Sequence, residues 1–215
     1  MLGRATAIGY FPEDGGGVVA IAAPDRLYRV KARAWIWATG GYASNLPLPD
    51  NDRPGVLALR AVGRLLVDHG ILAGDRVCIV EVPEVAADVT ALATALVNAG
   101  AEVARVPLVK ASGTRGRGWV SGLDTTDGRI DCDVLAMAAI PAPASEGPRQ
   151  HGCKVVLDPS AGGFRVVIDG DGRTSTANVW ACGDVTGYVG PARAGAHGTA
   201  VGEHVVQNLG GTSGP

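Results

Sequence analysis

The sequence has no apolar stretch of the roughly 18 residues that a membrane-spanning helix requires, and no charged segment followed by an apolar one near its start. It also has no long run of lysine or arginine, and its formal net charge is −2. The densest basic patch, Arg115-Gly116-Arg117, is typical of a solvated loop, so nucleic acid is not expected as a partner. These absences predict a cytoplasmic protein without a membrane span.

Cysteine is scarce, and the four residues present (Cys78, Cys132, Cys153 and Cys182) form no Cys-x-x-Cys pair. This spacing excludes the dithiol centre of disulfide reductases and an iron–sulfur site of the spaced-cysteine kind. We expect reduced cysteines that act as small buried hydrophobic side chains. No metal site, no Ser-His-Asp arrangement and no pair of carboxylates stands out, so the sequence identifies no catalytic residue.

The composition is that of a globular protein, with 47% hydrophobic and 19% charged residues among the 215. A chain of this length holds one large domain or two small ones. Short apolar runs alternate with helical patterns along much of the sequence, which predicts an α/β fold.

The middle of the chain predicts a strand–helix–strand unit. Residues 76–81 and 102–109 have the apolar character of strands, and apolar residues recur at helical spacing between them until Gly100 ends the helix. The turn after the first strand, residues 81–85, contains no glycine and carries Glu81 and Glu84. A dinucleotide pyrophosphate there meets bulky side chains and like charge, so NAD binding is not expected.

Near the C-terminus, residues 174–184 indicate a turn and a short apolar strand that ends at Gly183-Asp184. Gly183 lets the backbone approach a ligand closely. The Asp184 carboxylate follows the strand, at the edge where open α/β sheets bind ligands, and it can accept hydrogen bonds from hydroxyl groups. A glycine-rich segment that includes Gly190 then leads into a helix expected over residues 192–208.

A second motif lies upstream. Residues 32–39 form a nearly continuous apolar run, as expected of a parallel strand that is buried on both faces. The run breaks at Gly40-Gly41. A helix is expected over residues 56–68, with Pro54 near its first turn and Gly70 beyond its end.

The two motifs, Ala38-Thr39-Gly40-Gly41 and Gly183-Asp184, resemble the flavin-contacting segments of the flavoproteins that contain two dinucleotide-binding domains. Together with the tyrosine-containing start, Gly9-Tyr10-Phe11, and with residues 162–175, the chain looks most like the α subunit of heterotetrameric sarcosine oxidase. The related subunits of opine oxidase, hydroxyproline dehydrogenase and hydrogen cyanide synthase fit about as well.

The resemblance implies an FAD site in which Asp184 binds the ribityl chain and the start of the last helix lies near the flavin pyrimidine. The cofactor-binding residues that it implies are Thr39, Gly40, Gly41, Gly183, Asp184, Gly190, Pro191 and Ala192. A helix-capping role for Asp184 is the alternative. His197 is a candidate proton donor beside the flavin, against the alternative of a histidine packed within a helix.

Relatives open with a strand, a Gly-x-Gly-x-x-Gly turn and a helix that hold the FAD pyrophosphate, and this sequence contains no such segment. The early cluster Asp14-Gly15-Gly16-Gly17 is typical of a hairpin turn instead. We therefore expect an incomplete FAD site. The chain is then a fragment, the product of a gene with a lost 5′ end, or a small subunit that a partner completes.

The expected organisation has three parts: a partial FAD-binding domain over residues 1–73, a degenerate NAD-like domain over 74–140, and a return to the FAD domain over 141–215. In this reading residues 141–144 are a linker and the last six residues are a disordered tail.

The resemblance implies the function of an oxidoreductase subunit that is inactive alone. This subunit supports flavin binding and electron transfer in a multi-subunit amine or imino-acid dehydrogenase or oxidase, and the substrate binds to another subunit. The alternative is a scaffold that keeps the fold and binds no nucleotide.

Overall fold

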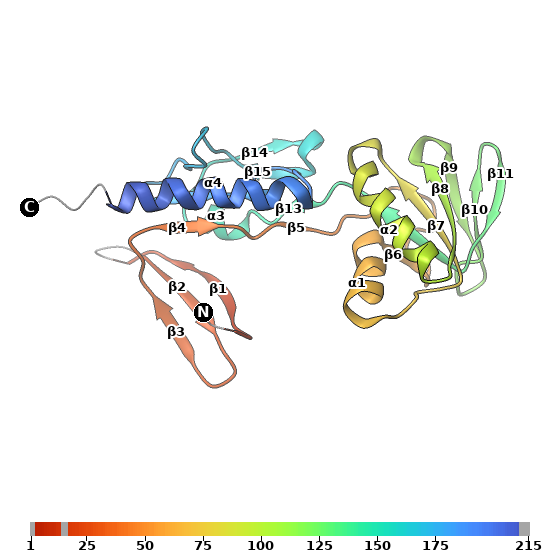
Figure 1. Ribbon diagram of the computed structural model, residues 1–215, viewed down its shortest axis with the longest axis horizontal. Helices are drawn as coiled ribbons and strands as arrows, with labels where there is room; N and C mark the ends of the chain where they lie inside the picture. Colours follow the sequence, from red (N-terminus) through yellow and green to blue (C-terminus); the bar gives the residue numbers. More distant parts are fainter. Residues whose placement is uncertain (1–2, 14–16, 211–215) are drawn as a thin grey trace, which may run out of the picture. The chain divides into compact units, whose positions relative to one another are not determined.

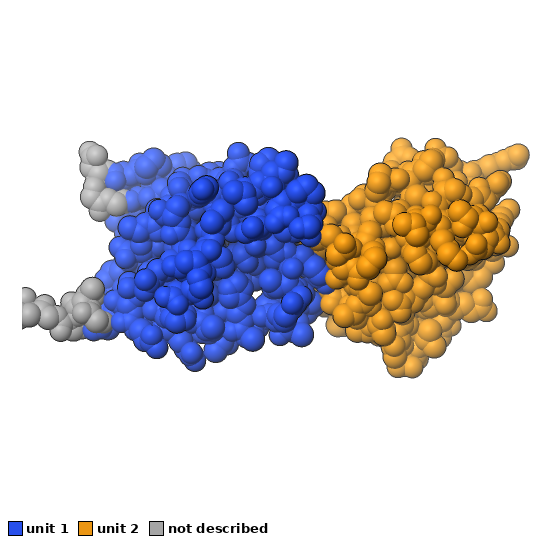
Figure 2. Space-filling model, turned by 90° about the horizontal axis from the view of Figure 1, so that it is seen from above, with its two compact units in different colours: residues 1–42, 142–215 blue, residues 43–141 orange. Residues whose placement is uncertain are grey.

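The computed structural model describes residues 3–13 and 17–210, and the chain forms two compact units (Figure 2). One unit contains residues 1–42 and 142–215, and the other contains residues 43–141. Most of the expected turn at residues 14–17 lies outside the described residues. All of the expected tail except Gly210 lies outside them as well. No helix in the described part of the chain is long and apolar enough to cross a membrane, and the described residues contain no cluster of His, Cys, Asp and Glu that could hold a metal ion.

The unit formed by residues 43–141 is built on a parallel sheet with the strand order β6-β12-β7-β8 (Figure 1). Its elements are β6 (Val56–Ala58), α1 (Leu59–His69), β7 (Arg76–Glu81), the short 3-10 turn η1 (Pro83–Val85), α2 (Ala86–Asn98), β8 (Glu102–Pro107), a second 3-10 turn η2 (Leu108–Lys110) and β12 (Val134–Ala138). The predicted strand–helix–strand unit over β7, α2 and β8 is confirmed.

The core of this sheet explains why β7 and β12 are almost purely apolar. Every residue of β12 is buried, and Cys78 pairs with Leu135 across the ladder. Alternate residues point to opposite faces, so Cys78 and Leu135 pack on one side with Leu123. Strands buried on both faces require such continuous apolar runs.

An antiparallel meander completes this unit: β9 (Ala111–Arg115), β10 (Gly122–Thr125) and β11 (Gly128–Asp131). β10 and β11 form a hairpin in which Thr125 pairs with Gly128. Residues 116–121 form the loop between β9 and β10. Gly116 has φ +148°, and a side chain there would lie 1.9 Å from the carbonyl oxygen of Trp119, so the tight loop requires glycine at this position.

Two expected bounds in this part of the chain differ from the structure. Residues 56–58, expected to open a helix, form β6, and α1 begins at Leu59. Gly70 ends α1 in the left-handed conformation, as expected. The expected domain boundary at residue 73 placed residues 43–73 with the N-terminal residues. Because β6 pairs with β12, residues 43–73 instead belong to the unit formed by residues 43–141. That pairing is a long-range contact, which local sequence does not reveal.

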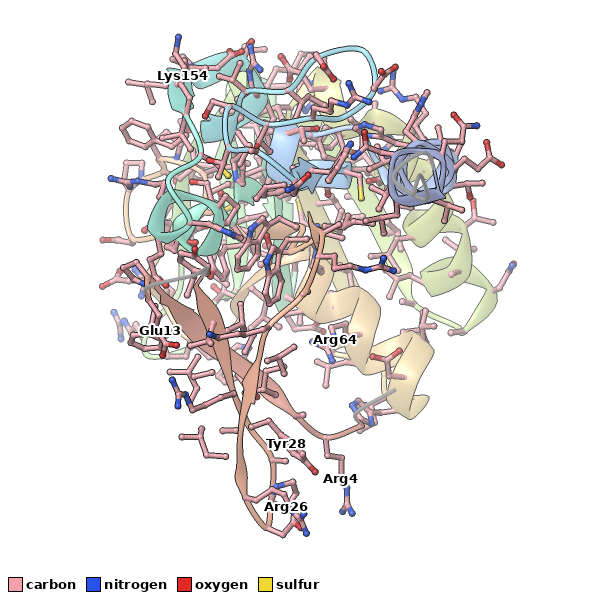
Figure 3. The ribbon with its side chains drawn as sticks, turned by 90° about the vertical axis from the view of Figure 1, so that its left-hand side faces the viewer. Arg4, Glu13, Arg26, Tyr28, Arg64 and Lys154 are labelled. Atoms are coloured by element: carbon pink, nitrogen blue, oxygen red, sulfur yellow. The ribbon has the colours of Figure 1, made fainter. Side chains whose placement is uncertain are left out.

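The other unit begins with an antiparallel sheet of β1 (Thr6–Phe11), β2 (Val18–Ala22) and β3 (Leu27–Val30). The Arg26 guanidinium lies 5.9 Å from the centre of the Tyr28 ring near the β2–β3 turn (Figure 3). Glu13 accepts a hydrogen bond from Arg29 on β3.

The rest of this unit consists of short strand pairs and two helices. Its elements are β4 (Trp35–Trp37), β5 (Gly41–Tyr42), β13 (Ala142–Pro143), α3 (Glu146–Gln150), β14 (Val155–Asp158), η3 (Pro159–Ala161), β15 (Gly163–Val166), β16 (Val179–Ala181), η4 (Gly183–Thr186) and α4 (Pro191–Gly210). The expected final helix is confirmed as α4. The expected linker contains β13, which pairs with β5.

The strand expected over residues 32–39 is shorter and more exposed than the sequence predicted. Only Trp35–Trp37 is a strand, it pairs on one side with β16, and the Ile36 side chain is 44% exposed. The apolar run therefore does not reflect burial on both faces. The two tryptophans instead pack against a core cluster that includes Val166 and Val179.

Candidate functional site

The two glycine motifs singled out in the sequence lie at the same edge of one small parallel sheet. Trp37 of β4 pairs with Ala181 of β16, and the Cys182 N–H donates to the Trp37 carbonyl oxygen at 3.0 Å. Both strands end immediately afterwards, one at Thr39-Gly40-Gly41 and the other at Gly183-Asp184. Open α/β folds bind ligands at the carboxyl ends of parallel strands, so this edge is the candidate site.

Gly183 takes a conformation that other residues adopt only with strain. Its φ is +74°, and its N–H donates to Nδ1 of His197 on α4 at 3.2 Å. His197 therefore fastens the strand end to the last helix. An Nδ1 that accepts this bond carries no proton, so the structure favours the packing role of His197 over the role of proton donor through this atom.

The Asp184 carboxylate organises the loop that leads to α4. Its Oδ1 accepts hydrogen bonds from the N–H groups of Val189 at 3.0 Å and Gly190 at 3.3 Å. The backbone N–H of Gly187 in turn donates to the Asp184 carbonyl oxygen at 3.1 Å. The carboxylate is thus held in one place by backbone donors, directly before the start of the helix.

The start of α4 adds backbone donors to this edge. Pro191 is its first residue and has no N–H, while the amides of Ala192 and Arg193 belong to the first turn, which has no acceptors within the helix. The Arg193 Nε donates back to the Val189 carbonyl oxygen at 2.9 Å. Gly190, Pro191 and Ala192 thus lie where the helix presents its positive end.

The upstream motif is anchored on one side and open on the other. The Thr39 hydroxyl donates to the Ala144 carbonyl oxygen at 2.7 Å, and the Ala144 N–H donates to the Gly40 carbonyl oxygen at 2.9 Å. Gly40 has φ +70°, and no heavy atom lies within 4 Å of the position that a Cβ would take there. The backbone at Gly40 is accessible to a ligand for this reason.

An aromatic cluster surrounds His151, a residue to which the sequence analysis assigned no role. His151 is 8% exposed, its ring stacks on Tyr10 with centroids 3.7 Å apart, and its Nδ1 accepts a hydrogen bond from Trp37 Nε1 at 3.2 Å. Burial lowers the pKa of His151. No local pattern signals the cluster, because its members come from β1, β4 and the end of α3.

The neutral state of His151 predicts a pH-dependent stability. A lowered folded-state pKa means that stability is complete above the unfolded value of about 6.5 and is lost as the pH falls through the folded-state pKa. We expect the free energy of unfolding to fall more steeply in the wild type than in His151→Gln between about pH 7 and about pH 5. Urea unfolding across this range measures it, with His69→Gln, a change of an exposed histidine, as control. Equal slopes in wild type and His151→Gln would contradict the prediction.

All four cysteines are buried and free. Cys78 and Cys132, distant in sequence, meet in the core of the larger sheet, and a hydrogen bond between them together with burial raises the pKa of the Cys78 thiol. Burial likewise raises the pKa of Cys182, beside Gly183. Cys78 and Cys182 are therefore held as protonated thiols, which are poor nucleophiles.

The sequence predicted that Glu81 and Glu84, at the turn after β7, would both repel a dinucleotide pyrophosphate. Residues 83–85 form a 3-10 turn that begins at Pro83, with no glycine to admit a pyrophosphate. Glu81, however, forms two hydrogen bonds with the Arg105 guanidinium, at 2.9 and 2.8 Å, so its charge is compensated. Of the two carboxylates, only Glu84 contributes the expected repulsion.

No family model and no curated protein matches this sequence. The fold, however, is the mixed α/β fold of FAD- and NAD-binding oxidoreductases, because solved structures of this class superpose on nearly the whole chain. With identities below 25%, this likeness concerns the fold alone.

Three of these structures show the extent of the match. The chain is similar to L-proline dehydrogenase from P. horikoshii, with a TM-score of 0.80, 18% identity and coverage of 96% of this chain and 41% of that one. It is similar to thioredoxin reductase from T. acidophilum, with a TM-score of 0.65, 18% identity and coverage of 95% and 74%. For an FAD-dependent pyridine nucleotide-disulphide oxidoreductase from Desulfovibrio vulgaris the TM-score is 0.61, the identity 18% and the coverage 95% and 61%.

Proposed function

We propose that this chain contributes part of the flavin site of an FAD-dependent oxidoreductase that acts on an amine or imino acid of the sarcosine, opine or hydroxyproline kind. The observation that carries the proposal is the meeting of Thr39-Gly40-Gly41 and Gly183-Asp184 at one sheet edge. The chain spans 41% of the proline dehydrogenase that it superposes on. The proposal includes partner chains that complete the site and bind the substrate.

The residues at this edge fit part of a flavin. Asp184 offers a fixed carboxylate as hydrogen-bond acceptor for a ribityl hydroxyl, and the open backbone at Gly40 admits a ligand without a steric conflict. The amides of Ala192 and Arg193 and the positive end of α4 stabilise negative charge. FAD, when bound, supplies the two-electron redox chemistry that side chains lack.

The alternative is a scaffold role without a nucleotide. One observation favours it: Oδ1 of Asp184 already accepts two backbone hydrogen bonds, which is what a purely structural turn requires. The two proposals differ in whether the carboxylate also contacts a ligand.

Purification of the tagged chain from the cells that produce it distinguishes the two. We expect flavin absorbance to co-elute with the chain and with at least one further polypeptide, which mass spectrometry identifies. Release of FAD by heat, followed by chromatography, establishes the cofactor. A well-folded complex that elutes without flavin, and that binds none on titration, supports the scaffold role instead.

NADH and NADPH are expected not to bind to this chain. The 3-10 turn at Pro83–Val85 lacks the glycines that let a pyrophosphate approach the helix start, and Glu84 adds negative charge there. Titration of NADH against the purified protein, followed by nicotinamide fluorescence, is expected to show no saturable change. Saturable binding of NADH at micromolar concentration would contradict this expectation. If Glu84→Gln then left the NADH affinity unchanged, another part of the chain would have to take the place of the glycine turn.

A further inference from the structure

A surface cavity of about 500 Å³ that is largely open to solvent lies in the unit formed by residues 43–141, and four arginines contribute to its lining: Arg53, Arg115, Arg117 and Arg129. The other lining residues are Thr114, Gly116, Ser121 and Asp124. They come from the segment before β6, from β9, β10 and β11 of the meander (Figure 1), and from the loop 116–121. Sequence reasoning saw only Arg115 and Arg117 and interpreted them as a solvated loop.

The wall of this cavity is built by specific contacts. Arg53 is only 19% exposed, and its guanidinium donates to the Gly116 carbonyl oxygen at 2.6 Å and to Asp50 at 2.8 Å. The loop is fastened at its other end, where the Val120 N–H donates to the Pro54 carbonyl oxygen at 2.8 Å. Arg53 and the loop are therefore held in position before any ligand arrives.

The arginines retain donor capacity after their internal bonds are counted. Arg115 binds Asp124 through its Nε alone, at 2.6 and 2.7 Å, and Arg129 binds Asp131 through its Nε at 2.6 Å. A guanidinium has five N–H donors, so the terminal nitrogens of both remain for a ligand. Arg117 has no hydrogen bond or ion pair within the described part of the chain.

We propose that this cavity binds a diphosphate group, either as free pyrophosphate or as the phosphate tail of a nucleotide. Planar guanidinium forks recognise phosphate oxygens through paired hydrogen bonds, and the Ser121 hydroxyl adds a further donor. The lining residues include no aromatic ring on which a base stacks, so recognition is of the phosphates. Three arginines with spare donors, Arg115, Arg117 and Arg129, suit two linked phosphates better than one.

This site is separate from the turn that follows β7. Arg53 precedes β6, at the amino end of the parallel sheet, whereas residues 83–85 follow the carboxyl end of β7. All of its lining residues belong to the unit formed by residues 43–141, whereas the residues of the proposed flavin site belong to the other unit, so the inference stands independently of that site. It assigns a function to the meander, which the proposed flavin chemistry does not use.

Calorimetric titration of the full chain at constant ionic strength tests the proposal with pyrophosphate, ADP and AMP. We expect saturable one-to-one binding of pyrophosphate, of ADP, or of both, and binding of AMP at least about tenfold weaker. Binding of pyrophosphate alone indicates the free anion, whereas equal binding of ADP indicates a nucleotide tail. The absence of saturable heat with both diphosphates overturns the proposal.

Arg117→Ala is the most informative variant, because the Arg117 side chain is exposed and makes no hydrogen bond or ion pair within the described residues whose loss would destabilise the fold. It is expected to weaken diphosphate binding roughly tenfold or more, and Arg117→Lys, which keeps the charge and loses the fork, to weaken it less. Arg64→Ala on α1 is the control, with the same change of charge at a residue that does not line the cavity. An equal loss in Arg64→Ala shows non-specific attraction and overturns the site.

Discussion

Replacement of Asp184 by alanine is expected to lower the FAD affinity of the assembled complex by roughly tenfold to a hundredfold. The loss of one charge-assisted hydrogen bond in a largely dry site costs about 1–3 kcal/mol, and about 1.4 kcal/mol corresponds to one decade in affinity. The structure adds a second contribution, because the same carboxylate oxygen holds the amides of Val189 and Gly190 in place. The rate of flavin dissociation from wild-type and variant complexes measures the effect.

Two further variants separate these contributions. Asp184→Asn keeps an oxygen that accepts from both amides and loses only the charge, so a smaller loss of FAD affinity is expected. Asp25→Ala, an exposed carboxylate in the turn before β3, is the matched control and should leave FAD affinity unchanged. Unchanged affinity in an Asp184→Ala complex that circular dichroism shows to be folded would mean that Asp184 only closes the turn.

Replacement of Ile79 by alanine is expected to cost about 2–5 kcal/mol of the free energy of unfolding. Ile79 lies in β7, between β12 and β8 in the sheet, and its side chain has no exposed surface. Truncation removes apolar contacts and leaves a cavity that a strand bonded on both sides cannot close. Urea unfolding, followed by far-ultraviolet circular dichroism, gives the change.

The matched control for this change is Ile71→Ala. Ile71 follows α1 in the same unit, and its side chain is 52% exposed, so its truncation is expected to cost clearly less. Comparable losses in the two variants would contradict the assignment of Ile79 to the core.

Much of the fold follows from short-range patterns. The apolar run of β7, the helical spacing within α2 and the glycines that follow α1 and α2 predict those elements directly, because each depends on residues within a few positions. Gly183 and Gly40, which the sequence singled out as the ends of strands, both take positive φ in the structure. The helix expected over residues 56–68 was wrong in its first three residues. The local pattern at residues 56–58 is ambiguous between helix and strand, and the pairing of β6 with β12 makes these residues a strand.

The sequence by itself determined that this chain is an α/β protein with two glycine-containing strand ends, a turn after β7 without glycine, and no Cys-x-x-Cys pair. The tertiary structure alone decided that the two strand ends meet, that His151 lies against Tyr10 and Trp37, and that Arg53 joins Arg115 and Arg117 around one cavity. The reason is physical. Backbone conformation depends on near neighbours in the chain, whereas a site depends on which distant segments hydrogen-bond and pack together, and burial shared by the whole unit fixes that choice.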